Sequence, residues 1–114
     1  MQVAVIHTAF EDTPRTVAFV EVGDRTGTDA LEYAYMRTNN IMGSWSRSAE
    51  FTFAGETVVN EDFSEDVTVM AELPVSERTG ETMGLRSTSM GDRMLMGTTM
   101  FEVAAFGFKE VEMA

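Results

Sequence analysis

Two runs of β-branched and aromatic residues open the chain, Val3–Phe10 and Thr16–Val22, and the segment between them contains Asp12 and Pro14. Such runs are typical of strands, and Asp and Pro are turn formers. Alternate positions of the second run give one face that is entirely apolar. The sequence therefore predicts an N-terminal hairpin whose sheet meets a helix on one face.

A single main helix is expected after this hairpin. Asp29 and Glu32 have the spacing of a capping box, and Thr28 is an alternative cap. Apolar residues then recur mostly at three- and four-residue steps as far as Met42, and Gly43 is a residue that commonly ends helices. These features predict a helix from Asp29 to Met42, about four turns long.

The remaining strands are expected further along the chain. Ser44–Asp66 is largely polar and acidic, and its alternating Phe51–Phe53 predicts loops with one short strand. Val67–Leu73 alternates as a strand that Pro74 ends. Near the C-terminus, two apolar runs joined by Gly97–Thr99 predict a second hairpin.

Together these elements predict one α+β domain over residues 1–114. Its antiparallel sheet has about five strands, from an N-terminal hairpin, a C-terminal hairpin and the strand between them, and the main helix packs on one face. A chain of 114 residues is long enough to bury one core. It has no Cys, which excludes disulfides and thiolate chemistry, so the fold must rest on packing.

The charge of the chain restricts its partners. Nineteen Asp and Glu against eight Lys and Arg give a net charge of −11. Such a field repels phosphate backbones, so no direct binding of nucleic acid is expected. The surplus either keeps a small domain soluble or serves a protein that imitates DNA in a basic groove. No signal peptide and no apolar run of ~20 residues is present, which predicts a cytoplasmic protein without membrane contact.

Two segments resemble a known family. Arg86–Asp92, followed by the second hairpin and Phe106–Phe108, resembles the C-terminal pattern of YodL-like domains. Those domains occur in small accessory proteins of plasmids, phages and other mobile elements. Leu31–Asn40 with Ser44–Ser46 is similar to the helix that precedes this pattern. The resemblance implies no reaction; by analogy it implies a protein that acts on host machinery or host defence inside a bacterial cell.

The Arg86–Arg93 turn is the candidate site for a small ligand or anion. The hydroxyls of Ser87 and Ser89 could line a phosphate-binding turn, and Arg86 and Arg93 flank them. In the alternative interpretation the hydroxyls cap a turn and Asp92 hydrogen-bonds the loop backbone. A nucleotide-binding enzyme would require the four candidate side chains to converge on a pocket.

A different set of residues is the candidate protein-binding surface. Trp45 is expected in a loop, where it either contacts a partner or anchors the loop against the sheet. Four acidic residues in the next loop, Glu61, Asp62, Glu65 and Asp66, match no calcium-loop spacing. We therefore expect a solvated acidic surface, with no metal and no cofactor.

No catalytic residue is predicted. His7 is the only His, it falls within an expected strand, and no nucleophile motif accompanies it. The sequence therefore predicts a non-enzymatic accessory protein of a phage or other mobile element, one that binds a host or defence protein through an acidic surface. Three alternatives remain open: a DNA-mimic inhibitor, a small-ligand or nucleotide-binding enzyme that uses the Arg86–Arg93 turn, and a structural subunit of a virion.

Overall fold

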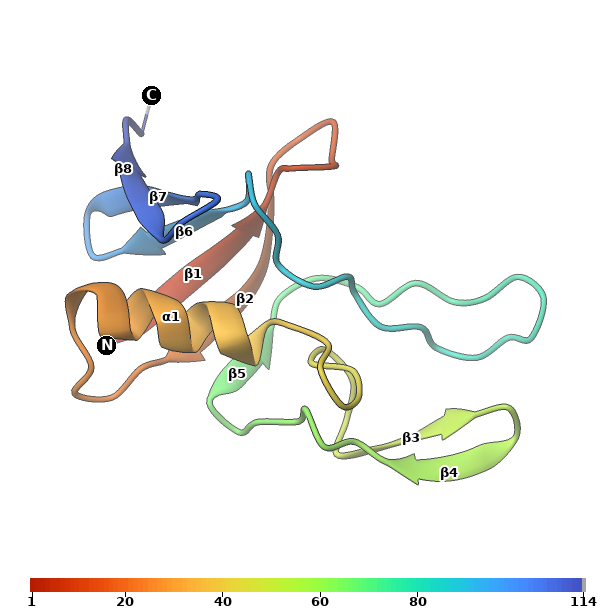
Figure 1. The fold of residues 1–114 in the computed structure, drawn as a ribbon. Coiled ribbons are helices and arrows are strands. Elements are labelled where there is room, and N and C mark those ends of the chain that lie inside the picture. The colour runs from red at the N-terminus through yellow and green to blue at the C-terminus, as the bar shows by residue number, and fades with distance from the viewer. Residues whose placement is uncertain (114) are drawn as a thin grey trace.

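The computed structural model describes residues 1–113 and contains one helix, a six-stranded antiparallel sheet and a separate two-stranded sheet (Figure 1). The large sheet has the spatial order β5-β2-β1-β6-β7-β8. Its strands are β1 (Gln2–His7), β2 (Arg15–Glu21), β5 (Val67–Val69), β6 (Arg93–Met96), β7 (Thr99–Val103) and β8 (Phe108–Val111). The helix is α1 (Gly27–Arg37), and the small sheet pairs β3 (Glu50–Phe53) with β4 (Glu56–Val59).

Both predicted hairpins are present. β1 pairs with β2 so that Val3 lies opposite Val20, and a register shift follows Val5. β6 and β7 form the C-terminal hairpin. The two hairpins join because β1 also pairs antiparallel with β6, with Val5 opposite Met94. Strands from the two ends of the chain therefore lie at the centre of one sheet.

The helix is shorter than expected and begins earlier. Its N-cap is Thr26, which makes no side-chain capping hydrogen bond, so the predicted capping box at Asp29 is wrong. The helix ends at Thr38, because the backbone beyond it bonds to a distant segment: the Thr38 carbonyl accepts from the N–H of Thr88 at 2.9 Å. As predicted, α1 packs on one face of the sheet, across β1 and β2 (Figure 1).

The core lies between α1 and the sheet. It contains aliphatic residues of β1, β2 and α1, together with Trp45, Leu85, Met94 and Val103. Apolar side chains on alternate strand positions meet the apolar stripe of the helix, which is the packing that the periodicities of both elements require.

The strand count and layout differ from the expectation of about five strands. β8 adds a third strand to the C-terminal hairpin, and β5 covers only the first part of the predicted Val67–Leu73 strand. The expected single strand at Phe51–Phe53 is one half of a hairpin. Its turn consists of Ala54 and Gly55, whose φ angles of 53° and 81° are both positive, as a two-residue hairpin turn requires.

Two arms project from the same end of the molecule, away from β6–β8 (Figure 1). The first arm, residues 49–60, is the β3–β4 hairpin. The second arm, residues 74–84, is an irregular loop closed by a hydrogen bond from Met83 N to Pro74 O at 2.7 Å. The radius of gyration is 14.5 Å, against about 13 Å for a compact chain of this length, which agrees with projecting arms.

Within residues 1–113 no helix is both long and apolar enough to cross a membrane.

Candidate functional site

Arg86 lies at the centre of an ion-pair network that joins the two ends of the chain. Its Nη1 lies 2.7 Å from Asp92 Oδ2, and its Nη2 lies 2.8 Å from Glu11 Oε1. The Asp92 side chain is fully buried, whereas those of Arg86 and Glu11 are about a quarter exposed. Bidentate pairing of this kind satisfies the planar guanidinium and fixes its orientation.

The carboxylate of Asp92 organises the surrounding backbone. It accepts hydrogen bonds from the N–H groups of Thr8, Ala9 and Ser89 at 2.8–2.9 Å. Burial alone would raise the pKa of Asp92, but these bonds and the Arg86 guanidinium outweigh it and lower the pKa to about 2. Hydrogen bonds from the same guanidinium lower the pKa of Glu11. Both groups are therefore ionised at neutral pH.

His7 takes part in a buried hydrogen-bond chain beside this network. The Thr38 hydroxyl donates its single proton to the Ala34 carbonyl at 2.8 Å, so it accepts from the Thr88 hydroxyl. The proton of Thr88 is thereby used, and His7 Nε2 donates to the Thr88 oxygen at 3.0 Å. Burial lowers the pKa of His7 and outweighs the opposite effect of Asp92. His7 is thus a neutral, interior hydrogen-bond donor.

The four predicted anion-binding residues do not converge on a pocket. Every side-chain nitrogen of Arg86 already donates to Glu11, Asp92 or the Ser87 carbonyl. The Ser87 hydroxyl accepts from Asn40 N, and the Ser89 hydroxyl donates to the Ser87 carbonyl. Arg93 lies on β6, where its Nε is 3.7 Å from Glu102. This geometry matches the alternative interpretation, in which Asp92 hydrogen-bonds the loop backbone.

The predicted protein-binding residues divide into buried and exposed positions. Trp45 is 1% exposed and donates through Nε1 to the Arg86 carbonyl, which corrects the expectation of a partner contact there. Asp62 accepts from the backbone of residues 41–43, and Asp66 accepts from the Tyr33 hydroxyl. Glu61 and Glu65 are exposed, so these two carboxylates are the ones of that loop that face solvent.

Buried polar contacts fix the roots of both arms. The Asn60 amide accepts from Ser44 N and donates to the carbonyls of Ser44, Arg47 and Ser48, which holds the first arm to the preceding loop. Leu85 N donates to the Ser46 hydroxyl at 2.7 Å, which holds the second arm to the same loop. The loop of residues 44–48 therefore carries both arms and sets their spacing.

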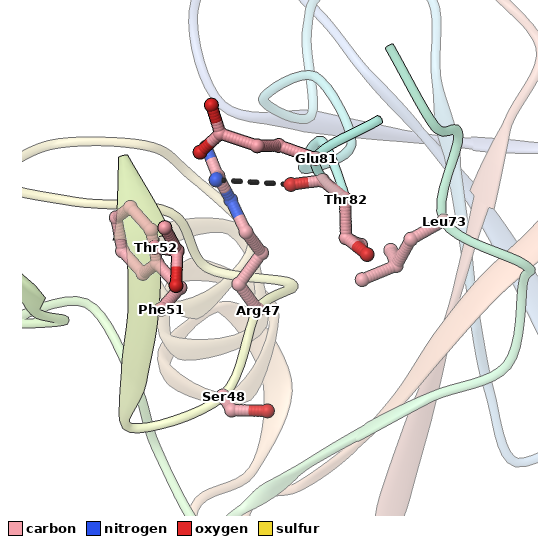
Figure 2. A pocket seen from close by; sticks show the side chains of 7 residues that line it. All are labelled: Arg47, Ser48, Phe51, Thr52, Leu73, Glu81 and Thr82. Carbon is pink, nitrogen blue, oxygen red and sulfur yellow. Dashed lines mark hydrogen bonds between the residues drawn. The ribbon is translucent and has the colours of Figure 1, made fainter. Parts of the chain in front are cut away.

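A groove lies between the two arms. Figure 2 shows its inner part, a cavity of about 460 Å³ lined by Arg47, Ser48, Phe51, Thr52, Leu73, Glu81 and Thr82. Arg47 spans it: its guanidinium lies 4.0 Å from the centre of the Phe51 ring, and Nη1 donates to the Thr82 carbonyl at 3.2 Å. An outer cavity of about 280 Å³ shares Arg47, Thr52 and Glu81 and extends toward the arm tips.

Most of the net charge lies in the segment that runs from the first arm to the second, although residues 49–60 and 74–84 themselves carry only −3 of it. Residues 48–84 contain nine of the nineteen carboxylates and one of the eight cationic side chains, a net charge of −8. The rest of the chain, with ten carboxylates and seven cationic side chains, carries only −3. The acidic surplus is therefore a property of the arm-bearing segment rather than of the whole surface.

Sequence reasoning missed this groove. Arg47, Leu73 and Thr82 come from three separate segments, and no local pattern marks them as neighbours. The available signal was Gly55 between two short alternating runs, because glycine is a common turn residue between two strands of a hairpin.

Comparisons with protein families, curated proteins and solved structures found no match for this chain. Among residues 1–113, no group of three or more His, Asp or Glu side chains is arranged to hold a metal ion. The inference of function therefore rests on the geometry and charge of the arms.

Proposed function

We propose that this chain is a non-enzymatic accessory protein of a phage or other mobile element, and that it binds a host or defence protein in the bacterial cytoplasm through the acidic surface of residues 48–84. One observation carries the proposal: residues 48–84, which form the two projecting arms and the chain between them, hold −8 of the net charge. A concentrated charge of one sign steers a partner of opposite sign toward that end of the molecule. The resemblance of Arg86–Asp92 to YodL-like domains supports the accessory role.

The test uses two charge variants of equal size. The arm variant replaces four exposed carboxylates of residues 48–84 by amides: Glu50→Gln, Glu56→Gln, Glu72→Gln and Glu77→Gln. The control variant replaces four exposed carboxylates elsewhere: Asp24→Asn, Glu32→Gln, Glu110→Gln and Glu112→Gln. Both variants change the net charge equally, so only the position of the charge differs.

Each tagged protein is incubated with a bacterial lysate, and the retained proteins are identified by mass spectrometry and then purified for affinity measurements. The proposal expects one protein with a basic surface that the wild type and the control variant retain. The arm variant should bind it about tenfold more weakly or worse, because several favourable charge contacts are lost together. Equal retention by all three proteins, or no specific retention, would contradict the proposal.

The concentration of carboxylates also favours a second candidate, the DNA-mimic inhibitor. Its partner would be a DNA-binding protein, and duplex DNA would compete with this chain for the partner's basic groove. Competition by duplex DNA in the same affinity measurement therefore separates a DNA mimic from a ligand of any other basic surface.

A further inference from the structure

The free edge of β3 faces the groove. The Asn60 N–H donates to the Ala49 carbonyl at 2.7 Å, which sets the phase of hydrogen bonding along the hairpin. Paired residues of an antiparallel ladder alternate between bonded and non-bonded positions, so Glu50 and Thr52 direct their N–H and C=O groups away from β4. The groove is lined by β3 and the second arm, and Figure 1 shows the second arm on the β3 side of the hairpin.

This edge is open to another strand. Among the described residues 1–113, β3 pairs only with β4, in a sheet of two strands. An unpaired edge of this kind is a template to which an extended segment of another chain can add, with main-chain hydrogen bonds that supply affinity. The inner cavity, at about 460 Å³, gives room for side chains of such a segment.

The two faces of β3 differ in chemistry and so specify the added segment. Phe51 and Phe53 share one face, and Glu50 and Thr52 share the other. Side chains of an added strand would lie beside those of β3 on each face, where apolar pairs and opposite charges are favourable. Apolar residues therefore suit the phenylalanine face, and Lys or Arg suits the face of Glu50.

The charged residues around the groove are mixed. Glu81 lines both cavities and Glu77 is exposed on the second arm, whereas Arg78 lines the outer cavity. In the inner cavity the Arg47 guanidinium is already stacked on Phe51 and bonded to the Thr82 carbonyl. A basic residue of an occupant is therefore favoured at the inner cavity, beside Glu81, and not beside Arg78. We propose that the groove binds an extended segment of the partner protein, in which Lys or Arg alternates with apolar residues, as a third strand on the edge of β3. This inference rests on the proposed protein-binding function and specifies its mode.

The probe is a short peptide in which Lys alternates with Val, and the control peptide has Glu in place of Lys. Thr52→Pro removes the N–H that faces the groove, whereas Thr57→Pro removes the corresponding N–H on the opposite edge of the hairpin, because Thr57 pairs with Thr52. Both substitutions lie in one hairpin and leave its internal hydrogen bonds in place, so they form a matched pair.

We expect the Lys–Val peptide to bind the wild type and Thr57→Pro equally, and to bind Thr52→Pro about tenfold more weakly. The Glu–Val peptide should not bind. In the wild type, bound peptide should slow hydrogen exchange at the Thr52 N–H and leave the Thr57 N–H unchanged, a measurement that does not depend on how well either variant folds. Equal weakening by both prolines, equal binding of both peptides, or unchanged exchange at Thr52 would overturn the inference.

The two proposals can fail separately. If Thr52→Pro retains a protein partner that the arm charge variant loses, the partner binds the arms but not the β3 edge, and only this inference fails. If the Lys–Val peptide protects Thr52 but no lysate protein is specifically retained, the groove stands and the proposed function fails.

Discussion

Among single residues, Asp92 and Arg86 join segments that lie far apart along the chain. Asp92 brings together the backbone after β1 and the turn before β6, and Arg86 neutralises its buried charge. A buried ion pair gives little net stability over an apolar pair, but removal of one member leaves a charge without compensation. The consequence of a substitution therefore depends strongly on which member is removed.

Arg86→Met should destabilise the fold by about 3–5 kcal/mol, because it leaves the Asp92 carboxylate buried without its cation. Arg93→Met is the matched control: Arg93 is more exposed and lies 3.7 Å from Glu102, so its loss should cost about 1 kcal/mol or less. Urea denaturation of the two variants and the wild type measures both values. Similar losses in the two variants would show that the Arg86 network is not a stabilising centre.

Acid should destabilise this protein in two steps. Burial lowers the pKa of His7 below 6.5 in the folded protein. Between that lower pKa and 6.5 the unfolded chain therefore binds more protons than the folded protein does. The free energy of unfolding falls as the pH decreases below about 6.5. The pKa of Asp92 is about 2 in the folded protein and 3.8 in the unfolded chain. Its contribution of about 2 kcal/mol is complete above pH ~4 and is lost as the pH falls toward 2.

The unfolding free energy from urea titrations at a series of pH values tests both steps. His7→Gln should remove the first step and leave the second. As the only His, His7 also gives a single ring signal by nuclear magnetic resonance. A titration midpoint of that signal at or above 6.5 would contradict the assignment of His7 as a buried, neutral donor.

The sequence could predict part of the site at this scale. Hydrogen bonding of Asp92 to nearby backbone was one of two interpretations of the Arg86–Arg93 turn, because such turns are local. The partners Glu11 and His7 lie more than seventy residues away along the chain, so no spacing rule could pair them with Arg86 or Thr88. Burial of Trp45 likewise follows from tertiary packing rather than from the residues beside it.

At the scale of elements, the parts of the fold that depend on local chemistry were predictable. Alternating apolar runs and turn residues indicated the β1–β2 and β6–β7 hairpins, since both signals lie within about twenty residues. The end of α1 was not predictable, because residues 38–40 bond to residues 85–88 instead of continuing the helix. The order of strands in the large sheet was not predictable for the same reason, because β1 and β6 are paired although most of the chain separates them.

The arms illustrate this limit. Each arm is a local hairpin or loop, but their shared orientation depends on the loop of residues 44–48. Asn60, at the end of the first arm, and Leu85, directly after the second arm, both bond to that loop. Gly84 makes the close approach possible, because a Cβ there would collide with the Ser44 hydroxyl. A groove between the arms is thus a product of long-range packing.

At the scale of the whole molecule, the arrangement of charge determines which partners can approach. Composition predicted an acidic surface but not its position. Since −8 of the charge lies in residues 48–84, which form the two arms, β5 and the loops between them, the molecule is polarised toward this segment, and the rest of the chain carries only −3. Such polarity orients a basic partner during encounter and weakens with salt.

This polarity can be measured without a partner protein, because small cationic and anionic probes should approach different parts of the surface. A cationic nitroxide added to the labelled protein should broaden amide signals of residues 48–84 more than an anionic nitroxide does, because the negative potential concentrates cations at the arms. For residues of β6–β8, the two probes should differ much less.

In about 1 M salt the screening length falls to about 3 Å, so the contrast between probes should largely disappear. The arm variant with four amides should reduce the contrast at the arms, whereas the control variant should preserve it. A uniform contrast along the chain would mean that the folded surface spreads its charge evenly, and would remove the electrostatic basis for binding through the arms.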